Sequence, residues 1–251
     1  MTLKLAEKVA VITGGSTGIG LAIAKRFVRE GAKVYITGRR QAELDAAVQA
    51  IGGSAESARV DSADIGQLHF LFDHVKAKHG KLDVLVANAG GGSLMPLGQI
   101  TEEHFDDTFT RNVKGTLFTV QTALPLLGKG SSVILTGSTA ASGGTEAFSV
   151  YAASKAAVRA FARNWILDLK GREIRVNTLS PGPIKTPGLV ELVGTDVDEQ
   201  QGFLDQLASL IPMGRVGDPD EIAKAAVFLA SEDSSFVNGI ELFVDGGMRQ
   251  I

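Results

Sequence analysis

Short apolar runs alternate with helix-length amphipathic segments along the whole chain. Most of the short runs are rich in Val and Ile, as strands buried on both faces are. The predicted strands are Val9–Thr13, Lys33–Thr37, Ser54–Val60, Val84–Ala87, Ser132–Thr136, Arg175–Leu179 and Gly239–Val244. The predicted helices are Gly18–Glu30, Gln41–Ile51, Ala63–Lys78, Glu102–Leu127, Ser149–Leu169 and Pro219–Ala230. This repetition requires parallel pairing through right-handed crossovers, so it predicts an α/β, Rossmann-type doubly wound parallel sheet of about seven strands, with helices on both faces.

One segment departs from this alternation. Thr186–Arg215 follows a predicted strand and is irregular, apart from a helical middle at Val197–Leu210. A segment of this kind at the carboxyl end of a sheet is typical of an active-site cover. We therefore expect a helical substrate lid near residues 187–213. No linker or repeat interrupts the rest, which predicts a single domain over residues 1–251.

Composition excludes several classes of function. The chain has 251 residues, of which 44% are hydrophobic and 21% charged, as expected for a globular protein with a full core. The net charge of −3 gives no indication of a nucleic-acid partner. Because there is no cysteine, disulfides, thiolate catalysis and cysteine metal sites are excluded. We also predict no catalytic metal, because three of the four histidines fall on one predicted helix at five-residue intervals, which do not share a face. No apolar run approaches the ~18 residues of a membrane span, and the N-terminus lacks a signal-peptide core, so no membrane association and a cytoplasmic location are expected.

A glycine-rich turn joins the first predicted strand to the first predicted helix. Its sequence is T-G-G-S-T-G-I-G, from Thr13 to Gly20. Such a turn lets the backbone approach a pyrophosphate at the positive end of a helix. The spacing is G-x-x-x-G-x-G and not the G-x-G-x-x-G of the common dinucleotide fingerprint. The residues expected to contact the cofactor here are Gly14, Ser16, Thr17, Gly18, Ile19 and Gly20.

The end of the second predicted strand indicates which cofactor binds. An NAD site has an acidic residue here for the ribose 2′-hydroxyl, whereas an NADP site has a cation for the 2′-phosphate. Gly38 stands where the acid would be, and Arg39 and Arg40 follow. A guanidinium suits a phosphate in charge and geometry, so NADP is the predicted cofactor.

Tyr151 and Lys155 lie four residues apart in Y-A-A-S-K, and Ser138 lies thirteen residues before the tyrosine. Residues four apart share one face of a helix. An ammonium beside a phenol stabilises the phenolate and so lowers the pKa of the phenol. Moving a tyrosine from ~10 to about 7 or 8 requires about 3 to 4 kcal/mol. With this shift, Tyr151 would be an acid/base near neutral pH that also hydrogen-bonds a substrate oxygen.

Together these motifs resemble those of the short-chain dehydrogenase/reductase family over essentially the whole chain. T-G-G-S-T-G-I-G matches the cofactor turn, and A-N-A-G (87–90) matches N-N-A-G with Ala87 in place of the first Asn. R-N-V-K-G contains Asn112, T-G-S-T contains Ser138, N-T-L-S-P-G-P-I-K-T covers 177–186, and V-D-G-G lies near the end. Within the family, the chain is most similar to bacterial NADP-dependent secondary-alcohol dehydrogenases, or carbonyl reductases.

The resemblance implies a catalytic role for four residues. Tyr151 exchanges the proton of the substrate hydroxyl, and Lys155 lowers the pKa of Tyr151 and binds the nicotinamide ribose. Ser138 donates to the same substrate oxygen, and Asn112 holds a water beside Lys155. Further cofactor contacts are implied for Asp61, Ser62, Asn88, Ala89, Gly90, Pro181, Gly182, Ile184 and Thr186. The resemblance implies that Ile184 and Thr186 bind the carboxamide of the nicotinamide. This contact leaves one face of the ring open and so implies 4-pro-S hydride transfer.

The favoured activity is therefore reversible reduction of an uncharged, fairly bulky ketone. The expected pocket combines 91–94, 139–140, 142–148 and 189–192, whose residues carry few charges. A 3-oxoacyl-[acyl-carrier-protein] reductase is an alternative, for which Lys129, Arg172 and Arg175 would form the docking patch. A sugar or steroid dehydrogenase and a non-catalytic NADP-binding sensor remain further alternatives. The family resemblance also implies a homotetramer that uses the helix of Tyr151 as one interface.

Overall fold

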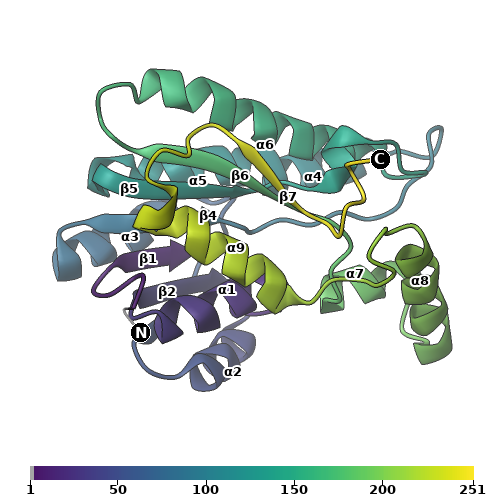
Figure 1. Ribbon diagram of the computed structural model, residues 1–251, viewed down its shortest axis with the longest axis horizontal. Helices are drawn as coiled ribbons and strands as arrows, with labels where there is room; N and C mark the ends of the chain where they lie inside the picture. The colour runs from purple at the N-terminus through teal and green to yellow at the C-terminus, as the bar shows by residue number, and fades with distance from the viewer. Residues whose placement is uncertain (1–2) are drawn as a thin grey trace.

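Seven parallel strands form one sheet, in the order β3–β2–β1–β4–β5–β6–β7, in the computed structural model, which describes residues 3–251 (Figure 1). The strands are β1 Val9–Ile12, β2 Lys33–Gly38, β3 Ala55–Arg59, β4 Leu82–Ala87, β5 Leu127–Thr136, β6 Arg175–Pro181 and β7 Glu241–Val244. The predicted doubly wound parallel sheet is confirmed. Because the strand order reverses between β1 and β4, a crevice is expected beyond the carboxyl ends of these two strands.

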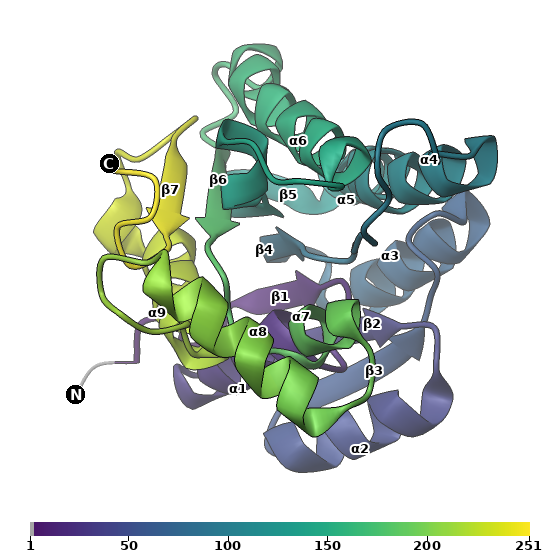
Figure 2. The same ribbon diagram turned by 90° about the vertical axis from the view of Figure 1, so that its right-hand side faces the viewer.

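Helices cover both faces of the sheet (Figure 2). They are α1 Gly18–Arg29, α2 Gln41–Ile51, α3 Ile65–His79, α4 Glu102–Phe109, α5 Gly115–Ala123, α6 Ser149–Asp168, α7 Pro187–Val190, α8 Val197–Ser209 and α9 Pro219–Ala230. One core lies under α1, α2 and α9, where Phe27, Leu44 and Ile222 are fully buried. A second core lies under α3, α5 and α6, around Leu71 and Val158. The strands between the cores are buried on both sides, which explains their nearly continuous apolar runs.

The predicted helix Glu102–Leu127 is wrong in its interior and at its end. The chain forms α4, then a π turn at Thr110–Lys114, then α5 and a short 3₁₀ turn at Leu124–Leu126. Leu127 already begins β5, in which Gly130 has a φ of +80° and the register with β4 shifts. Apolar periodicity predicts a helix over this length. It gives no signal for a π turn, in which the backbone hydrogen bonds join residues five apart instead of four.

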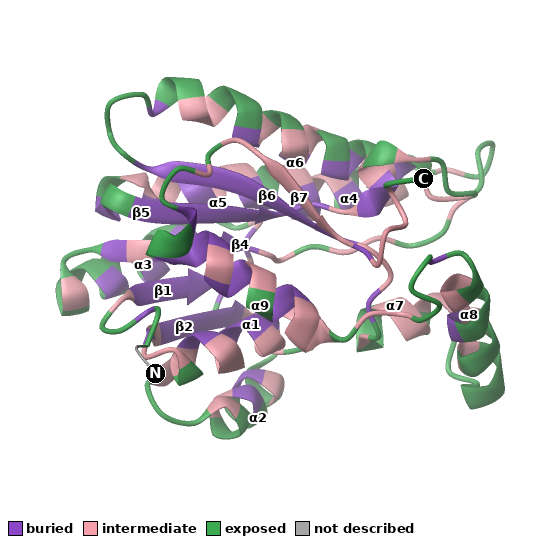
Figure 3. Cartoon of the chain, in the orientation of Figure 1, coloured by how far each residue is buried: buried purple, intermediate pink, exposed green. Residues whose placement is uncertain are grey.

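The segment predicted as a lid is helical and lies beyond the carboxyl ends of the strands (Figure 1). It contains α7, a 3₁₀ turn at Glu191–Val193 and α8. Thr186 caps α7 by accepting a hydrogen bond from Leu189, and Asp196 caps α8. Most of α8 is exposed, with Leu204 as its buried residue (Figure 3). Few buried apolar contacts hold α8 on the body, as is common for segments that move.

Two negative findings apply to residues 3–251. None of their helices is both long and apolar enough to cross a membrane. In the same range, no three His, Asp or Glu side chains gather in a way that could hold a metal ion.

Candidate active site

The glycine turn after β1 forms a cradle that side chains would fill. Gly14 and Gly18 have φ values of +63° and +53°, which a residue with a Cβ rarely adopts. A Cβ on Gly20 would collide with the Gly14 carbonyl oxygen and would lie 2.7 Å from Nδ2 of Asn88. Thr17 precedes α1 without capping it through its side chain, so the first N–H groups of α1 are left for an anion. The cradle therefore fits a pyrophosphate.

The loop after β4 is tied to this cradle. The hydroxyl of Thr13 accepts hydrogen bonds from the backbone N–H groups of Asn88 and Ala89, each at 3.0 Å. The Asn88 amide donates to the carbonyls of Thr13 and Gly14 at 3.0 and 3.1 Å. Asn88 thus fixes the glycine turn against β4, and this role does not involve Ala87.

The end of β2 lies beside the glycine turn. A Cβ on Gly38 would be 3.3 Å from the hydroxyl of Ser16, so a carboxylate side chain there would crowd the turn. Arg40 forms an ion pair with Glu43 at 2.6 Å. Arg39 is exposed and has no ion pair within residues 3–251. Of the two arginines, Arg39 is the one whose guanidinium is left for a phosphate.

The residues after β3 and β6 also reach this edge. Asp61 accepts from the N–H of Ala63 at 2.9 Å, which forms a turn at the start of α3, and Ser62 is buried. After β6, a Cβ on Gly182 would lie 2.7 Å from Cα of Asp245. A Cβ on Gly18 would lie 3.3 Å from the methyl group of Thr186, so the start of the lid contacts the glycine turn. Pro181 ends β6, and Ile184 pairs in parallel with Gly217.

Asn112 lies in the π turn and joins the loop after β4 to α6. Its Oδ1 accepts from the N–H of Gly91, and its Nδ2 donates to the Gly91 carbonyl and to Oγ of Ser154, each at 2.9 Å. Ser154 in turn donates to the carbonyl of Tyr151 at 2.7 Å. Because the Asn112 side chain is occupied, the water expected beside Lys155 would have to bind the main chain of Asn112. That water stays a prediction.

Tyr151, Ser138 and Lys155 meet at the start of α6. Ser138 follows β5 and accepts from the N–H of Ala140 at 3.1 Å. The Tyr151 ring stacks on Phe148, with centroids 4.4 Å apart. Lys155 is buried, and its Nζ is 5.7 Å from the centroid of the Tyr151 ring. The side chain of Ser138 also hydrogen-bonds that of Tyr151, so the three side chains lie together, and their catalytic roles stay a prediction.

The electrostatics of the pair differ from the prediction. Burial raises the pKa of Tyr151, although hydrogen bonding by Ser138 partly offsets this rise. Nζ of Lys155 donates to the carbonyl of Thr136 at 2.8 Å, and burial lowers the pKa of Lys155 to about 8. The predicted lowering of the Tyr151 pKa is therefore not found in this structure, because desolvation of the phenol is the largest cause of its shift and Lys155 is not among the causes.

Several contributors to the site were not predicted from sequence. Thr13, Thr136 and Ser154 hold Asn88, Lys155 and Asn112 through the bonds given above. Gly92 belongs to the predicted pocket loop 91–94, but its place against the Tyr151 ring was not predicted: a Cβ there would be 2.5 Å from Cδ2 of Tyr151. The motifs contain Thr13 and Ser154, but a single sequence gives no signal for which side chain they contact.

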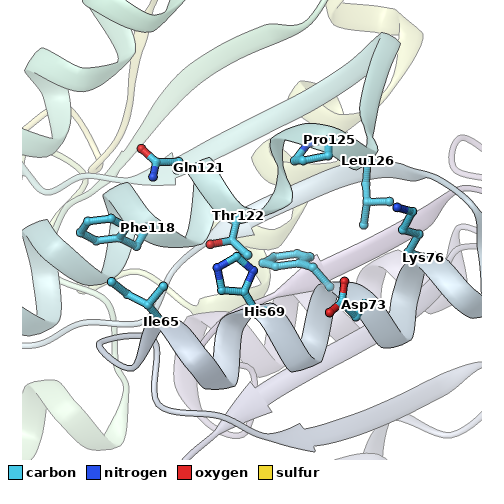
Figure 4. Close-up of a pocket in the computed structure, with 10 residues that line it drawn as sticks. Ile65, His69, Asp73, Lys76, Phe118, Gln121, Thr122, Pro125 and Leu126 are labelled. Carbon is cyan, nitrogen blue, oxygen red and sulfur yellow. The ribbon is translucent and has the colours of Figure 1, made fainter.

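A separate groove of about 260 Å³ lies between α3 and α5 (Figure 4). Its lining includes His69, Asp73 and Lys76 on α3 and Phe118 and Gln121 on α5. None of the predicted catalytic residues lines this groove. The candidate active site is instead the open edge where the loops after β1, β4, β5 and β6 come together.

Comparisons with known proteins agree with this geometry. A family model described as enoyl-(acyl carrier protein) reductase matches residues 14–249. The chain is 48% identical to oxidoreductase asL5 of Sarocladium schorii, over 99% of this chain and 98% of that protein. It is 37% identical to an NADP-dependent (R)-specific alcohol dehydrogenase of Lentilactobacillus kefiri, over 98% of each chain. Ligand-free aldohexose dehydrogenase of Thermoplasma acidophilum superposes with a TM-score of 0.90 at 32% identity, covering 100% of this chain and 97% of its own.

Proposed function

The chain belongs to the short-chain dehydrogenase/reductase family of oxidoreductases that use nicotinamide cofactors, and we propose that it interconverts ketones and secondary alcohols with NADP(H). The observation that carries this proposal is that Tyr151 hydrogen-bonds Ser138 and lies beside Lys155, at the edge that also holds the glycine cradle. We propose further that residues 1–251 act as a single catalytic domain.

In this proposal the bound cofactor supplies or accepts the hydride. Tyr151 donates its phenolic proton to the substrate oxygen during reduction and takes it back during oxidation. Ser138 donates to the same oxygen, where negative charge develops. Lys155 lies one turn along α6 and stabilises the charged form of the phenol once its own ammonium is formed. Asn112 holds the loop after β4 against α6 and thereby fixes the position of this loop next to the Tyr151 ring, where the substrate would bind.

The preference for NADP rests on Arg39 and Gly38. Arg39 offers an exposed guanidinium at the end of β2 that has no ion pair among residues 3–251, and Gly38 leaves no carboxylate to repel a 2′-phosphate. Arg39→Asp should lower the ratio of kcat/KM with NADPH to that with NADH by at least about tenfold, since charge-assisted hydrogen bonds contribute about 1.5 to 3 kcal/mol. Arg40→Asp is a matched control, because Arg40 is already paired with Glu43. An unchanged ratio in Arg39→Asp would contradict the assignment.

The substrate side is formed by the loops 91–94, 139–140, 142–148 and the lid around 189–192. Leu94 is 41% exposed beside this edge, and the backbone N–H of Met95 donates to the carbonyl of Ala147, which ties two of the loops together. Near the reacting atoms this lining is glycine, alanine and leucine. It suits a bulky ketone better than a sugar, whose many hydroxyl groups need polar partners.

A 3-oxoacyl-[acyl-carrier-protein] reductase is favoured by a relative of that name in Thermotoga maritima, 34% identical over 98% of this chain and 99% of that protein. The docking patch does not support it. Lys129 pairs with Glu173 at 2.9 Å, Arg172 donates to two backbone carbonyls, and Arg175 is buried. All three basic residues lie toward the amino ends of β5 and β6, at the edge opposite Tyr151.

A homotetramer is proposed on the basis of α6. Ala153, Ala156 and Ala160 form an exposed stripe of small side chains along this helix, and the stripe allows a second helix to approach closely. Next to it, Phe105 of α4 is 45% exposed and stacks on Phe109. Light scattering at micromolar concentration should give the mass of four chains, and a monomeric mass would exclude the assembly.

The decisive test is Tyr151→Phe. We expect this variant to bind NADPH as the parent does, and to lose at least about a hundredfold in kcat on ketones, since positioned acid/base groups contribute 10² to 10⁴. The assay is NADPH absorbance against a panel of ketones and alcohols. If the parent binds NADPH but reduces no carbonyl compound, and Tyr151→Phe behaves identically, the sensor alternative replaces this proposal.

A further inference from the structure

The C-terminal segment of the chain closes one side of the catalytic edge. The C-terminus lies on the same side of the sheet as α7 and α8 (Figure 1). A Cβ on Gly247 would lie 3.3 Å from Pro212, and the N–H of Met213 donates to the Gly246 carbonyl, so this segment contacts the end of the lid. It also contacts the loop after Ser138, through Arg249 and Gly143.

Arg249 lies directly on Gly143. A Cβ built on Gly143 would collide with Cζ and Nη1 of Arg249 and would lie 2.6 Å from its Nη2. Because Gly143 has a φ of −158°, backbone conformation does not require a glycine there. The missing side chain instead makes room for the guanidinium.

The backbone of this segment is fixed, which holds Arg249 in place. Asp245 is 9% exposed, and its two carboxylate oxygens accept from the N–H groups of Gly247 at 3.0 Å and of Arg249 at 2.8 Å. The carboxylate of Asp245 is therefore used by main-chain donors. It forms no ion pair with the guanidinium four residues later.

Within residues 3–251, the guanidinium of Arg249 makes no ion pair and no hydrogen bond. Its Nε is fully buried without an acceptor, whereas the residue as a whole is partly exposed. A guanidinium that is partly desolvated and unpaired is costly, and a carboxylate that binds it bidentately relieves that cost. The nearest acid in the sequence of the facing loop, Glu146, is exposed and does not pair with it.

We propose that Arg249 determines substrate specificity by binding a carboxylate on the ketone substrate. The inference rests on the function proposed above and narrows its substrate class. The preference for uncharged ketones followed from the loops near the reacting atoms and did not include the C-terminal segment. The substrate is neutral at its carbonyl end and carries its anionic group at the far end.

The distance between the two groups follows from the chain between them. Ser138 and Gly143 are joined by the 3₁₀ turn Thr139–Ser142. At a rise of ~2 Å per residue, the five steps from Ser138 to Gly143 cover about 10 Å. The carboxylate should therefore lie several bonds from the carbonyl, as in an aryl ketone with a carboxyalkyl chain on the ring, and not next to it as in a 2-oxo acid.

The test compares kcat/KM, with NADPH, for 4-acetylbenzoate and 4-(4-acetylphenyl)butanoate against their methyl esters. The parent should prefer the longer acid to its ester. Arg249→Met should lower kcat/KM for that acid roughly 10- to 100-fold and change the ester less than about twofold, in line with a charge-assisted hydrogen bond. Arg249→Lys should recover part of the loss. Gly143→Ala should lower the ratio of kcat/KM for the longer acid to that for its ester with the arginine still present, because the new Cβ displaces the guanidinium.

Two control measurements distinguish substrate binding by Arg249 from an internal ion pair and from a contact between subunits. Glu146→Gln should keep the preference for the acid; a selective loss equal to that of Arg249→Met would mean that Arg249 serves an internal pair, which overturns the proposal. A change in oligomeric mass in Arg249→Met would assign the residue to a contact between copies instead. If Arg249→Met changes kcat/KM equally for the acid and for its ester, the proposal is also refuted. If no ketone of either charge is reduced, the proposed function is refuted. The carboxylate site is then tested by the Tm: it is supported if the acid raises the Tm of the parent but not of Arg249→Met, and refuted if the acid raises neither or both.

Discussion

Replacing Lys155 by Met should stabilise the ligand-free protein at neutral pH while it removes activity. Lys155 is 4% exposed, and burial lowers its pKa from 10.5 to about 8. Folding must therefore place a costly ammonium in the core whenever the pH is below this value. A methionine side chain has similar length and no charge, so the cost disappears with the substitution.

The magnitude follows from the shift. Each unit of pKa shift corresponds to 1.36 kcal/mol, so a fall from 10.5 to about 8 costs the folded state about 3 kcal/mol at pH 7. The substitution also leaves the Thr136 carbonyl without its donor at 2.8 Å. An unsatisfied buried acceptor costs about 1 to 2 kcal/mol. The variant should therefore be more stable than the parent by about 1 to 2 kcal/mol at pH 7.

The sign of this difference should reverse at high pH. Because the folded pKa of Lys155 lies below the unfolded one, its favourable contribution is complete above 10.5 and is lost as the pH falls through about 8. In the parent, the free energy of unfolding therefore increases as the pH rises from about 8 to 10.5. In the variant, which has no lysine at this position, this increase is absent. Above about pH 10.5 only the lost hydrogen bond remains, and the variant should be the less stable of the two by about 1 to 2 kcal/mol.

Urea unfolding of both proteins without cofactor, at one fixed protein concentration and at several pH values across the window, measures the difference. Subtracting the free energy of unfolding of the parent from that of the variant at each pH removes the contributions of other groups that titrate in this window. Lys170→Met, which removes an exposed lysine just beyond α6, is the matched control and should change stability by less than about 0.5 kcal/mol at every pH. A Lys155→Met variant that is destabilised equally at neutral and alkaline pH would show that the ammonium carries no desolvation cost.

Three further substitutions test other contacts. Gly20→Ala should weaken NADPH binding at least tenfold by isothermal titration calorimetry, since its Cβ collides with the Gly14 carbonyl; Gly188→Ala, with open space around it, should not. Arg175→Met should lower the free energy of unfolding by about 2 to 4 kcal/mol, because it strips donors from Leu229, Ser231 and Ser234 at the end of α9; no loss would contradict this. Glu241→Gln should lower the Tm by several degrees, as it leaves Arg159 half-buried without its counter-charge while Ser180 can keep its bond; an unchanged Tm would mean that the pair contributes nothing.

The fold could be predicted from the sequence because a buried parallel strand must be apolar on both faces. A strand such as β1, Val9–Ile12, is therefore visible as a short continuous apolar run before a helical segment. Predicted and observed limits of α2 and α9 coincide, since Arg40 and Asp218 end a non-helical stretch just before them. The region 102–127 was less predictable. Its side chains favour helix throughout, and the π turn that breaks it is set by packing around Asn112.

The identity of the site residues was easier to predict than their energies. The family resemblance implied site roles for Ser138 and Asn88, and the topology brings both to one edge of the sheet because they follow the parallel strands β5 and β4. The pKa values depend on burial and on which acceptor a side chain reaches. No spacing in the sequence indicates that Lys155 bonds the carbonyl of Thr136. That contact determines the amine's orientation, and burial of the phenol determines the direction of the Tyr151 pKa shift.

Arg249 shows where sequence spacing ceases to be informative. It lies more than one hundred residues after Gly143, and no helical or strand period relates the two positions. Their contact depends on β7 closing the sheet beside β6, on Asp245 turning the chain back, and on glycine at 143 leaving space. Among the residues proposed for the chemistry, Ser138 follows β5 and so reaches the edge that the topology creates, and Tyr151 and Lys155 lie on α6, which packs against the turn after Ser138. The residue proposed to select the substrate comes from a segment placed by tertiary contacts alone, so the same catalytic edge can accept other substrates when only such a segment changes.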